Sequence, residues 1–539
     1  DSNGDGIGDL NGITSKLDYL KELGIDVIWM SPVYQSPNDD NGYDISDYQA
    51  IMDEFGTMED FDRLLSEAHK RGLRIVMDLV VNHTSDEHAW FVESRKGKEG
   101  PYADFYIWRD GKADGSEPNN WGSCFSGSAW QFDEGRGQYY LHLFSKKQPD
   151  LNWENPKLRK EIYKMINWWL DKGVAGFRID AIINIKKPLL FQDYPADRED
   201  GLCDMGQVLS HAKGIGQFLK EMREETFKPY DALTIGEVFN VEDEDLVEFI
   251  GEDGYFSSMF DFRETLEGKS LLGWYDSKIP SPDDYKRCCF ESQKTMEGIG
   301  YLSNIIENHD EPRGVSHYLP SYAQNEKGKK LLAAMYFMLK GLPFIYQGQE
   351  LGMENKIFTS IEEIDDISTK EEYRRCLEVG YNSDVALKAV GHYSRDNART
   401  PFQWSDKVNG GFTKGTPWLR MNDNYKTINA AEQLQREDSV FHFYKKLIAL
   451  REQERFSDTI VYGRTEPVLL EESNIMAYFR RGKGQDILVI GNFDRVCRTV
   501  KVGQTEGEIL LNNCKDVQIN GDSITLDSCQ ALVIAYLSK

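Results

Sequence analysis

The chain has 539 residues, of which 40% are hydrophobic and 12% aromatic, so it is long enough for more than one domain with sizeable cores. It carries 63 basic and 90 acidic side chains, a net charge of -27, and no basic cluster stands out. This charge balance argues against a nucleic acid or an anionic membrane as partner, whereas a small neutral ligand is compatible with it.

The first nine residues, DSNGDGIGD, form a polar loop that places acidic and amide oxygens around a glycine turn. Oxygen ligands spaced in this way suit a hard cation, although Gly12 stands where an EF-hand loop would carry its bidentate glutamate. The loop therefore predicts a structural calcium site, with magnesium as the other cation it would take. The predicted ligands are Asp1, Asn3, Asp5, Ile7 and Asp9.

Helix and strand patterns alternate from the start of the chain to about residue 350, which predicts parallel βαβ units. Residues 13–23 are typical of an amphipathic helix, and so are residues 58–71, which Gly72 ends. The buried strands expected between the helices begin near residues 26, 75, 174, 233, 257, 303 and 343. This count predicts an α/β fold, a (β/α)8 barrel whose first strand is expected to be missing before residue 1.

Two segments interrupt this alternation, and a third part of the chain abandons it. Residues 84–150 are rich in Trp, Gly, Asn and Ser and predict a small inserted domain, and residues 352–428 predict an irregular insert. After a helix expected at 440–454, strands follow one another without helices, which predicts an all-β sandwich. The predicted domains are the barrel at 1–83 and 151–456, the insert at 84–150, and the sandwich at 457–539.

Three carboxylates follow short apolar strand patterns: Asp180 in GFRIDAI, Glu237 in LTIGEVF and Asp310 in IIENHD. Because the C-terminal ends of parallel barrel strands meet at one mouth, these three side chains are expected to share a pocket. Three acids in one pocket suit cleavage of a glycosidic bond, which needs a proton donor, a nucleophile and negative charge beside a cationic transition state.

Further motifs surround these acids in the same order along the chain. They are DLVVNH (78–83), QPDLNW (148–153), GFRIDAI (176–182), IGEVF (235–239), ENHD (307–310), PFIYQGQE (343–350) and SRDNARTPFQW (394–404). As an ordered set they resemble glycoside hydrolase family 13, the α-amylase family, and within it the oligo-1,6-glucosidase and α-glucosidase group. The resemblance covers nearly the whole chain.

The resemblance implies a role for each acid. Asp180 is similar to the nucleophile that forms a β-glucosyl-enzyme intermediate, Glu237 to the acid/base, and Asp310 to the third acid, which holds sugar hydroxyls. Arg178 lies two residues before the nucleophile, on the same face of the strand, and is expected to keep Asp180 ionised.

The same resemblance implies a set of substrate contacts around the terminal glucose. Asp44 and Arg399 resemble a pair that closes the pocket behind the sugar, which predicts attack on the non-reducing end. Arg395 is a weaker candidate for the arginine of that pair. The predicted substrate-binding residues are Tyr43, Asp44, His83, Phe144, Arg178, His309 and Arg399.

The linkage preference stays open at this point. Ala181 follows the nucleophile, and in this group alanine there accompanies α-1,4 cleavage whereas valine accompanies α-1,6 cleavage. The loop at 186–203 otherwise resembles the oligo-1,6-glucosidase type. We therefore expect a retaining, exo-acting α-glucosidase that attacks both linkages of short oligosaccharides, with a slight lean to α-1,4.

Three alternatives remain. A trehalose-6-phosphate hydrolase would need a basic phosphate pocket, which Lys186 and Lys187 could supply. A sucrose isomerase would need an arginine-rich stretch after the third acid, where this chain has EPRGVSHYLP. A non-catalytic, transporter-associated homologue would lack catalytic acids and carry a membrane anchor, and neither holds here.

Eight cysteines without a CxxC pair are typical of free thiols in a reducing compartment. No signal peptide and no transmembrane run is seen, although a leader upstream of residue 1 stays open. The sequence thus predicts a cytoplasmic enzyme, a monomer or small homo-oligomer, whose partner is a small oligosaccharide and not a nucleic acid or membrane.

Overall fold

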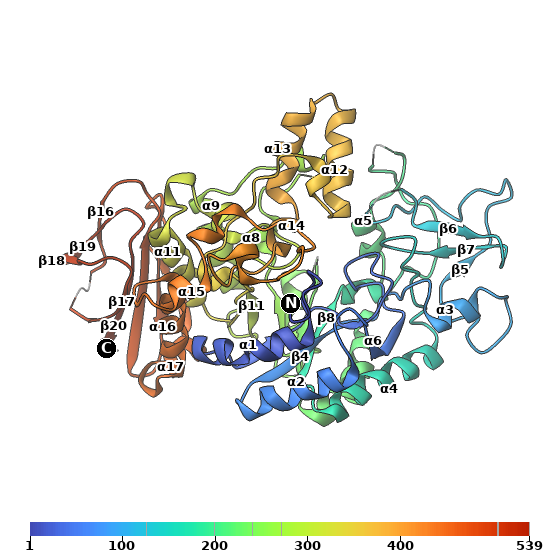
Figure 1. Cartoon of the computed structure of the whole chain (residues 1–539), viewed down its shortest axis with the longest axis horizontal. Coiled ribbons are helices and arrows are strands. Elements are labelled where there is room, and N and C mark those ends of the chain that lie inside the picture. Colours follow the sequence, from blue (N-terminus) through green and yellow to red (C-terminus); the bar gives the residue numbers. More distant parts are fainter. Residues whose placement is uncertain (126, 199, 240, 271, 504–505, 538–539) are drawn as a thin grey trace. The chain divides into compact units, whose positions relative to one another are not determined.

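A computed structural model describes residues 1–125, 127–198, 200–239, 241–270, 272–503 and 506–537 (Figure 1). The chain divides into two compact units. The first unit comprises residues 8–18 and 26–259, and the second comprises residues 1–7, 19–25 and 260–539. Helix α1 (Leu10–Leu23) contributes to both.

The first unit is built on parallel strands in the order β1-β4-β8-β9-β10. Their bounds are β1 (Val27–Trp29), β4 (Arg74–Val80), β8 (Gly176–Asp180), β9 (Leu233–Gly236) and β10 (Ser258–Phe260). In β4 and β8 almost every side chain is buried, as expected for strands covered on both faces. These five strands match the first five that the sequence predicts.

Helices that connect these strands begin and end at recognisable signals. Thr57 and Asp60 form a capping box at the start of α2 (Met58–Lys70). Asn155 caps α4 (Pro156–Lys172), which ends at Gly173 in the left-handed region. The other helices and strands of the unit are β2 (Tyr34–Gln35), β3 (Asp47–Ile51), α3 (Ala89–Ser94), α5 (Met205–Ser210), α6 (Ile215–Met222) and α7 (Leu246–Ile250).

The segment predicted as an insert contains its own small antiparallel sheet in the order β5-β7-β6. Its strands are β5 (Trp108–Arg109), β6 (Trp130–Asp133) and β7 (Gln138–Leu141). Trp121, Trp130 and Leu141 belong to one buried cluster there. The domain boundaries themselves stay predictions.

The second unit contains the last two predicted barrel strands, β11 (Leu302–Asn304) and β12 (Leu342–Pro343), which pair in parallel. Two helices precede β11 along the chain, α8 (Arg263–Leu266) and α9 (Pro282–Thr295). Two more lie between β11 and β12, α10 (Gly314–Tyr318) and α11 (Glu326–Phe337). Shorter helices α14 (Asp396–Arg399) and α15 (Ala430–Gln433) follow later.

The segment predicted as an irregular insert contains two regular helices, α12 (Ile367–Glu378) and α13 (Ser383–Tyr393), which pack side by side as a hairpin (Figure 1). That part of the sequence prediction is wrong. The apolar contact of the hairpin rests on a few small residues, Cys376, Ala386 and Val390. So few buried positions leave a weak helical periodicity in the sequence.

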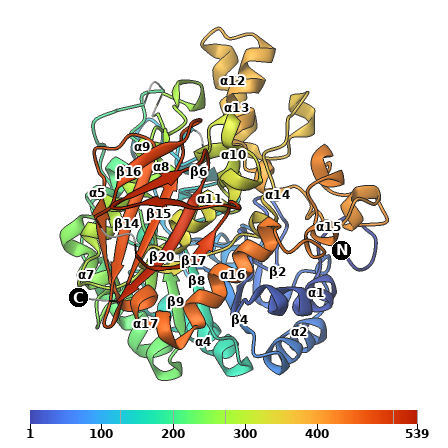
Figure 2. The same cartoon turned by 90° about the vertical axis from the view of Figure 1, so that its left-hand side faces the viewer.

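The C-terminal part is a β-sandwich, as predicted (Figure 2). Alternate residues of its five-stranded sheet face two different cores. Tyr478 and Val489 pack toward helices such as α11, whereas Phe479 and Leu488 pack toward the three-stranded sheet β16-β19-β18. The elements are α16 (Val440–Glu452), α17 (Glu454–Tyr462), β13 (Arg464–Val468), β14 (Ile475–Arg481), β15 (Gln485–Asn492), β16 (Arg498–Lys501), β17 (Glu508–Asn512), β18 (Gln518–Asn520), β19 (Ser523–Leu526) and β20 (Ala531–Leu537).

In the described part of the chain, no helix combines the length and the apolar character that crossing a bilayer requires.

Candidate active site

Arg178 lies at the centre of the site in the first unit, and strand register places it there. It pairs with Asp78 across β4 and β8, and its own strand continues to Asp180, two residues on and on the same face. On its other side β8 approaches β9 closely because Gly176, at φ 154°, has no side chain: a Cβ there would lie 1.8 Å from the Leu233 carbonyl oxygen.

Arg178 holds the two acids predicted as nucleophile and acid/base. Its Nη1 donates to the Asp180 carboxylate, and its Nη2 donates to Glu237 Oε1 at 2.6 Å. The other oxygen of Glu237, Oε2, accepts the Ala181 amide at 2.8 Å. Ala181 turns its amide toward Glu237 by adopting the left-handed region, with φ 41° and ψ 37°. Two acids from neighbouring strands are thus fixed by one guanidinium and one backbone amide.

A third carboxylate, Asp78, shares this guanidinium and was missed by the sequence analysis. Its oxygens lie 3.0 and 3.3 Å from Arg178 Nη1 and also accept from Tyr43 Oη at 3.0 Å and Trp29 Nε1 at 3.2 Å. Arg178 also lies over the Trp29 ring, 5.2 Å from its centroid. The signal in the sequence was a single aspartate inside the otherwise apolar, buried run at residues 75–80.

The charges of this cluster do not balance, because three carboxylates surround one arginine. Burial raises the pKa of Asp180, and Glu237 and Asp78 raise it further, while Arg178 opposes them. The contact predicted between Arg178 and Asp180 is present, but it is shared and does not keep the pKa of Asp180 low. Three ionised carboxylates beside one guanidinium are therefore unfavourable in this buried cluster.

His83 is buried beside this cluster with a neutral ring. Burial lowers the pKa of His83 to about 4. Its Nε2 lies 3.2 Å from both the Tyr43 carbonyl oxygen and Gln148 Nε2, and its ring centroid is 5.2 Å from that of Phe144. The structure thus brings together Tyr43, His83 and Phe144, while their contact with a sugar stays a prediction.

Asp44, predicted to close the pocket, is fully buried in the first unit. Its carboxylate accepts the backbone amides of Asp39 at 2.9 Å and Asp40 at 3.0 Å, and burial raises its pKa. The salt bridge predicted between Asp44 and Arg399 stays a prediction, because the two residues belong to different units.

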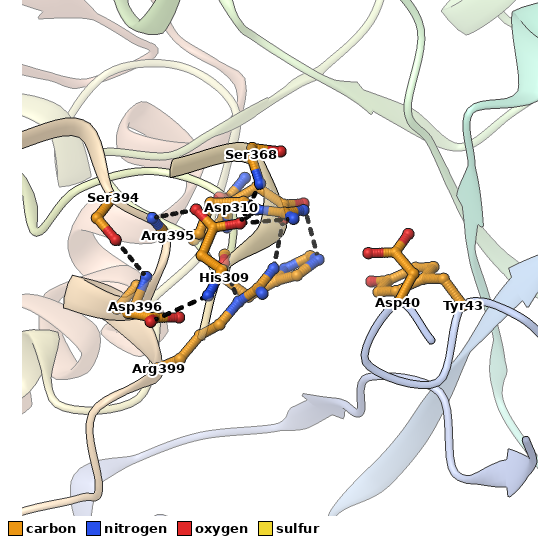
Figure 3. A network of polar contacts seen from close by, with 12 residues as sticks. Asp40, Tyr43, His309, Asp310, Ser368, Ser394, Arg395, Asp396 and Arg399 are labelled. Carbon is orange, nitrogen blue, oxygen red and sulfur yellow. Dashed lines mark hydrogen bonds and ion pairs between the residues drawn. The ribbon is translucent and has the colours of Figure 1, made fainter. Parts of the chain in front are cut away.

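The third acid, Asp310, lies in a cationic cluster of the second unit (Figure 3). His309 Nε2 is 2.9 Å from Asp310 Oδ2, and Arg399 Nη2 and Arg395 Nη1 are 3.0 and 3.3 Å from Asp310 Oδ1. Although burial raises the pKa of Asp310, His309, Arg399 and Arg395 hold it well below its usual range. These contacts favour the carboxylate form of Asp310, whereas the surroundings of Asp180 raise its pKa.

Arg395 is held differently from Arg399, although both reach Asp310. Arg395 Nε donates to Asp366 Oδ1 at 2.8 Å, and the Arg395 amide donates to Asp366 Oδ2 at 3.2 Å. Asp366 caps helix α12, so Arg395 ties the start of the hairpin to the third acid. Arg399 instead donates from Nε to the His309 carbonyl oxygen at 3.0 Å.

Two lysines considered for a phosphate pocket are engaged in ion pairs. Lys187, buried, lies 2.6 Å from Asp150 Oδ2 and donates to Asn82 Oδ1 at 2.7 Å. Lys186 pairs with Glu154. Their charges are thus largely neutralised within the protein.

Carboxylate oxygens of the N-terminal loop accept hydrogen bonds from backbone amides of the same loop. Asp1 accepts the Gly4 and Gly6 amides at 2.7 and 3.0 Å, and Asp5 accepts the Ile7 amide at 2.8 Å. Among the residues that the structure describes, no group of three or more His, Cys, Asp or Glu side chains is arranged to hold a metal ion. The arrangement gives no support to the predicted calcium site, which stays a prediction.

Comparisons with known proteins agree with this geometry. The family model "Alpha amylase, catalytic domain" matches residues 1–463. An oligo-1,6-glucosidase of Parageobacillus thermoglucosidasius is 49% identical over 495 residues, covering 92% of this chain and 87% of the relative. One of Halalkalibacterium halodurans is 48% identical over 547 residues, covering 100% and 96%.

A solved structure extends the likeness to three dimensions. The trehalose-6-phosphate hydrolase of Bacillus licheniformis is 41% identical and matches with a TM-score of 0.92, covering 100% of this chain and 97% of that one. The predicted fold class, an α/β barrel of the (β/α)8 type with an all-β C-terminal part, is thereby confirmed.

Proposed function

Because the chain belongs to the α-amylase family of glycoside hydrolases, we propose that it is a retaining, exo-acting α-glucosidase. It would release glucose from the non-reducing end of short α-1,6- and α-1,4-linked oligosaccharides. The observation that carries the proposal is the pair of acids, Asp180 and Glu237, held by two nitrogens of one buried guanidinium.

The proposed reaction has two displacements. In the first, the Asp180 carboxylate attacks the anomeric carbon while the protonated Glu237 carboxyl gives its proton to the leaving oxygen. In the second, the Glu237 carboxylate takes a proton from water, which attacks the anomeric carbon and releases Asp180. This needs two acids about 5 Å apart, a spacing that a shared guanidinium supports.

The first displacement needs a protonated carboxyl, and the charge imbalance of the cluster favours one. Three carboxylates around Arg178 leave two negative charges uncompensated if all are ionised, which burial makes unfavourable. A carboxyl of this cluster therefore enters the reaction protonated. Asp310, by contrast, stays ionised and is proposed to bind sugar hydroxyls.

Exo action rests on the proposed pairing of Asp44 with Arg399 behind the terminal glucose. Asp44 is buried without a salt-bridge partner in its own unit, among the residues described there, and one Arg399 nitrogen, Nη1, has no hydrogen-bond partner in the described part of the chain. The pairing itself stays a prediction, because the two residues belong to different units. An open cleft with internal cleavage would be the contrary result.

For linkage, the named relatives favour α-1,6 bonds, since both are called oligo-1,6-glucosidases. Ala181 favours activity on α-1,4 bonds as well, because its methyl group leaves more room than a valine would. We propose that both are cleaved, with α-1,6 preferred, a preference opposite to the slight lean that the sequence suggests.

Trehalose 6-phosphate is the second candidate substrate, favoured by the likeness to the Bacillus licheniformis hydrolase. The ion pairs of Lys186 with Glu154 and of Lys187 with Asp150 weigh against it, since a phosphate would meet neutralised lysines. A sucrose isomerase is disfavoured on sequence grounds, because EPRGVSHYLP stands where an arginine-rich stretch would be needed, and a non-catalytic role is disfavoured by the intact acids.

A cytoplasmic location is also proposed. It is supported by the eight cysteines, all of which are described and all of which are free thiols. The partner proposed is an oligosaccharide, and a monomer or small homo-oligomer is expected.

The proposal is tested by assaying isomaltose, maltose, sucrose and trehalose 6-phosphate side by side while NMR follows the anomer formed first. Retention predicts that α-glucose appears before mutarotation. The β-anomer would remove Asp180 as nucleophile, and activity on trehalose 6-phosphate alone would replace the proposed substrate. Asp180→Asn and Glu237→Gln, with wild-type circular dichroism, are expected to lose hydrolysis.

A further inference from the structure

Arg313 is one of the largest fully buried side chains of the protein, with 1% of its surface exposed. It precedes α10 and lies three residues after Asp310, in the segment EPRGVSHYLP. A buried guanidinium is costly unless its donors are satisfied. The groups that accept its hydrogen bonds therefore show which segments Arg313 holds together.

The guanidinium of Arg313 joins three segments that are distant in sequence. Its Nη1 donates to Glu307 Oε1 at 3.0 Å and to the Gln347 carbonyl oxygen at 2.7 Å. Its Nη2 donates to the Ala398 carbonyl oxygen at 3.1 Å. The three acceptors belong to the ENHD, PFIYQGQE and SRDNARTPFQW segments.

Neighbouring contacts lock the same junction. The second carboxylate oxygen of Glu307 accepts the Gly314 amide at 2.6 Å, and the Arg313 amide donates to Asn355 Oδ1 at 2.8 Å. The Tyr346 ring lies under the guanidinium, with its centroid 5.1 Å from Arg313 Cζ, and its hydroxyl donates to the Ala398 carbonyl oxygen at 3.1 Å. Ala398 is therefore fixed from two sides.

The residue after Ala398 is Arg399, whose guanidinium contacts both His309 and Asp310. Its Nη2 is 3.0 Å from Asp310 Oδ1, and its Nε donates to the His309 carbonyl oxygen at 3.0 Å. Arg313 follows Asp310 by three residues, and its side chain donates to Ala398, the residue before Arg399. Arg313 therefore sets the distance between the Arg399 backbone and Asp310.

We propose that Arg313 is a positioning residue for the reaction: it fixes the Ala398–Arg399 backbone against His309 and Asp310, and so sets the charge environment of the third acid. The inference rests on the proposed function, in which Asp310 binds the sugar as a carboxylate.

Lysine cannot replace Arg313 in this role, because one ammonium cannot reach three carbonyl and carboxylate acceptors held in a planar fork. Loss of the Ala398 contact would let Arg399 withdraw from Asp310. The charged groups facing Asp310 would then be His309 and Arg395, with Glu311 as a nearby acid whose own partner is Lys269. The pKa of Asp310 would rise.

The test compares Arg313→Lys with Arg480→Lys. Arg480 is an equally buried arginine of the same unit, but it donates to the carbonyl oxygens of Met338 and Gly463. Both variants should lower Tm. Arg313→Lys should also raise KM for isomaltose at least tenfold and move the acid limb of the kcat/KM profile to higher pH, and Arg480→Lys should do neither.

Tyr346→Phe is the second variant, and it keeps the test decisive if Arg313→Lys does not fold. It removes the hydroxyl contact to Ala398 and should shift KM and the acid limb in the same direction by a smaller amount. The inference is overturned if the folded variants keep the wild-type KM and pH profile, or if Arg480→Lys shifts them equally.

Asp310→Asn, measured in parallel, separates this inference from the proposed function. Wild-type activity of Asp310→Asn would contradict the proposed function itself. An inactive Asp310→Asn together with an unchanged Arg313→Lys profile would overturn the positioning role alone.

Discussion

Replacing Asp78 by asparagine removes one of the three carboxyl groups around Arg178 while keeping the shape of the side chain. Arg178 loses a charge-assisted hydrogen bond, which is worth about 1.5–3 kcal/mol. The loss is not larger, because Asp180 and Glu237 still neutralise the guanidinium, so no unpaired charge is left buried. Relief of like-charge repulsion offsets part of it, and we expect a net destabilisation of about 1–2 kcal/mol.

The same change should also shift the pH dependence of activity in a definite direction. Asp78 is one of the charges that raise the pKa of Asp180, so its removal lowers that pKa. The nucleophile then stays ionised to lower pH, and the acid limb of kcat/KM moves to lower pH. A carboxyl whose folded pKa is raised contributes stability that is lost as pH rises, so the variant should also lose less stability on going from acid to neutral pH.

The assay is kcat/KM against pH with a chromogenic α-glucoside, together with thermal unfolding. Asp133→Asn is the matched control: Asp133 is buried and pairs with Arg95, outside the Arg178 cluster. It should lower Tm without moving the acid limb. An acid limb that stays in place or moves to higher pH in Asp78→Asn would refute the reasoning.

Three further predictions follow from other residues. Burial raises the pKa of Glu264 to about 8 from 4.5, so stability should fall between these pH values by up to about 1.4 kcal/mol per unit, and Glu264→Gln should flatten that slope in pH-dependent thermal melts. Ala181→Val adds a β-branched side chain at φ 41°, where such residues are strained, and should lower the maltose-to-isomaltose activity ratio; an unchanged ratio would contradict the linkage argument. If the N-terminal loop binds calcium, the ion at about 100 times its Kd should add about 2.7 kcal/mol of stability and Asp5→Ala should abolish the gain, whereas equal melting with calcium and with a chelator would end that prediction.

The strands and the acids at their ends could be predicted from the sequence alone. Asp180, Glu237 and Asp310 each follow a short, apolar, β-branched run, which is the local signal of a buried strand. The C-terminal strands were equally clear because alternate residues face two apolar cores. Local patterns of this kind need no knowledge of distant residues.

What the sequence could not show depends on partners far along the chain. Asp78 looks like an ordinary interruption of a strand until the register of β4 and β8 brings Arg178 beside it. Arg313 binds mainly backbone carbonyls, which leave no mark on the residue types at 347 and 398. Hairpin α12–α13 was missed because small residues, Ala386 among them, form its contact.

The central claim is that Asp180 forms the covalent bond to glucose, and trapping that bond tests it most directly. A slow mechanism-based substrate, a 5-fluoro-α-glucosyl fluoride, should inactivate the enzyme and accumulate a glucosyl adduct. Peptide mass spectrometry should then place the adduct on the Asp180 carboxylate. An adduct on another residue, such as Asp78 or Glu237, would contradict the account.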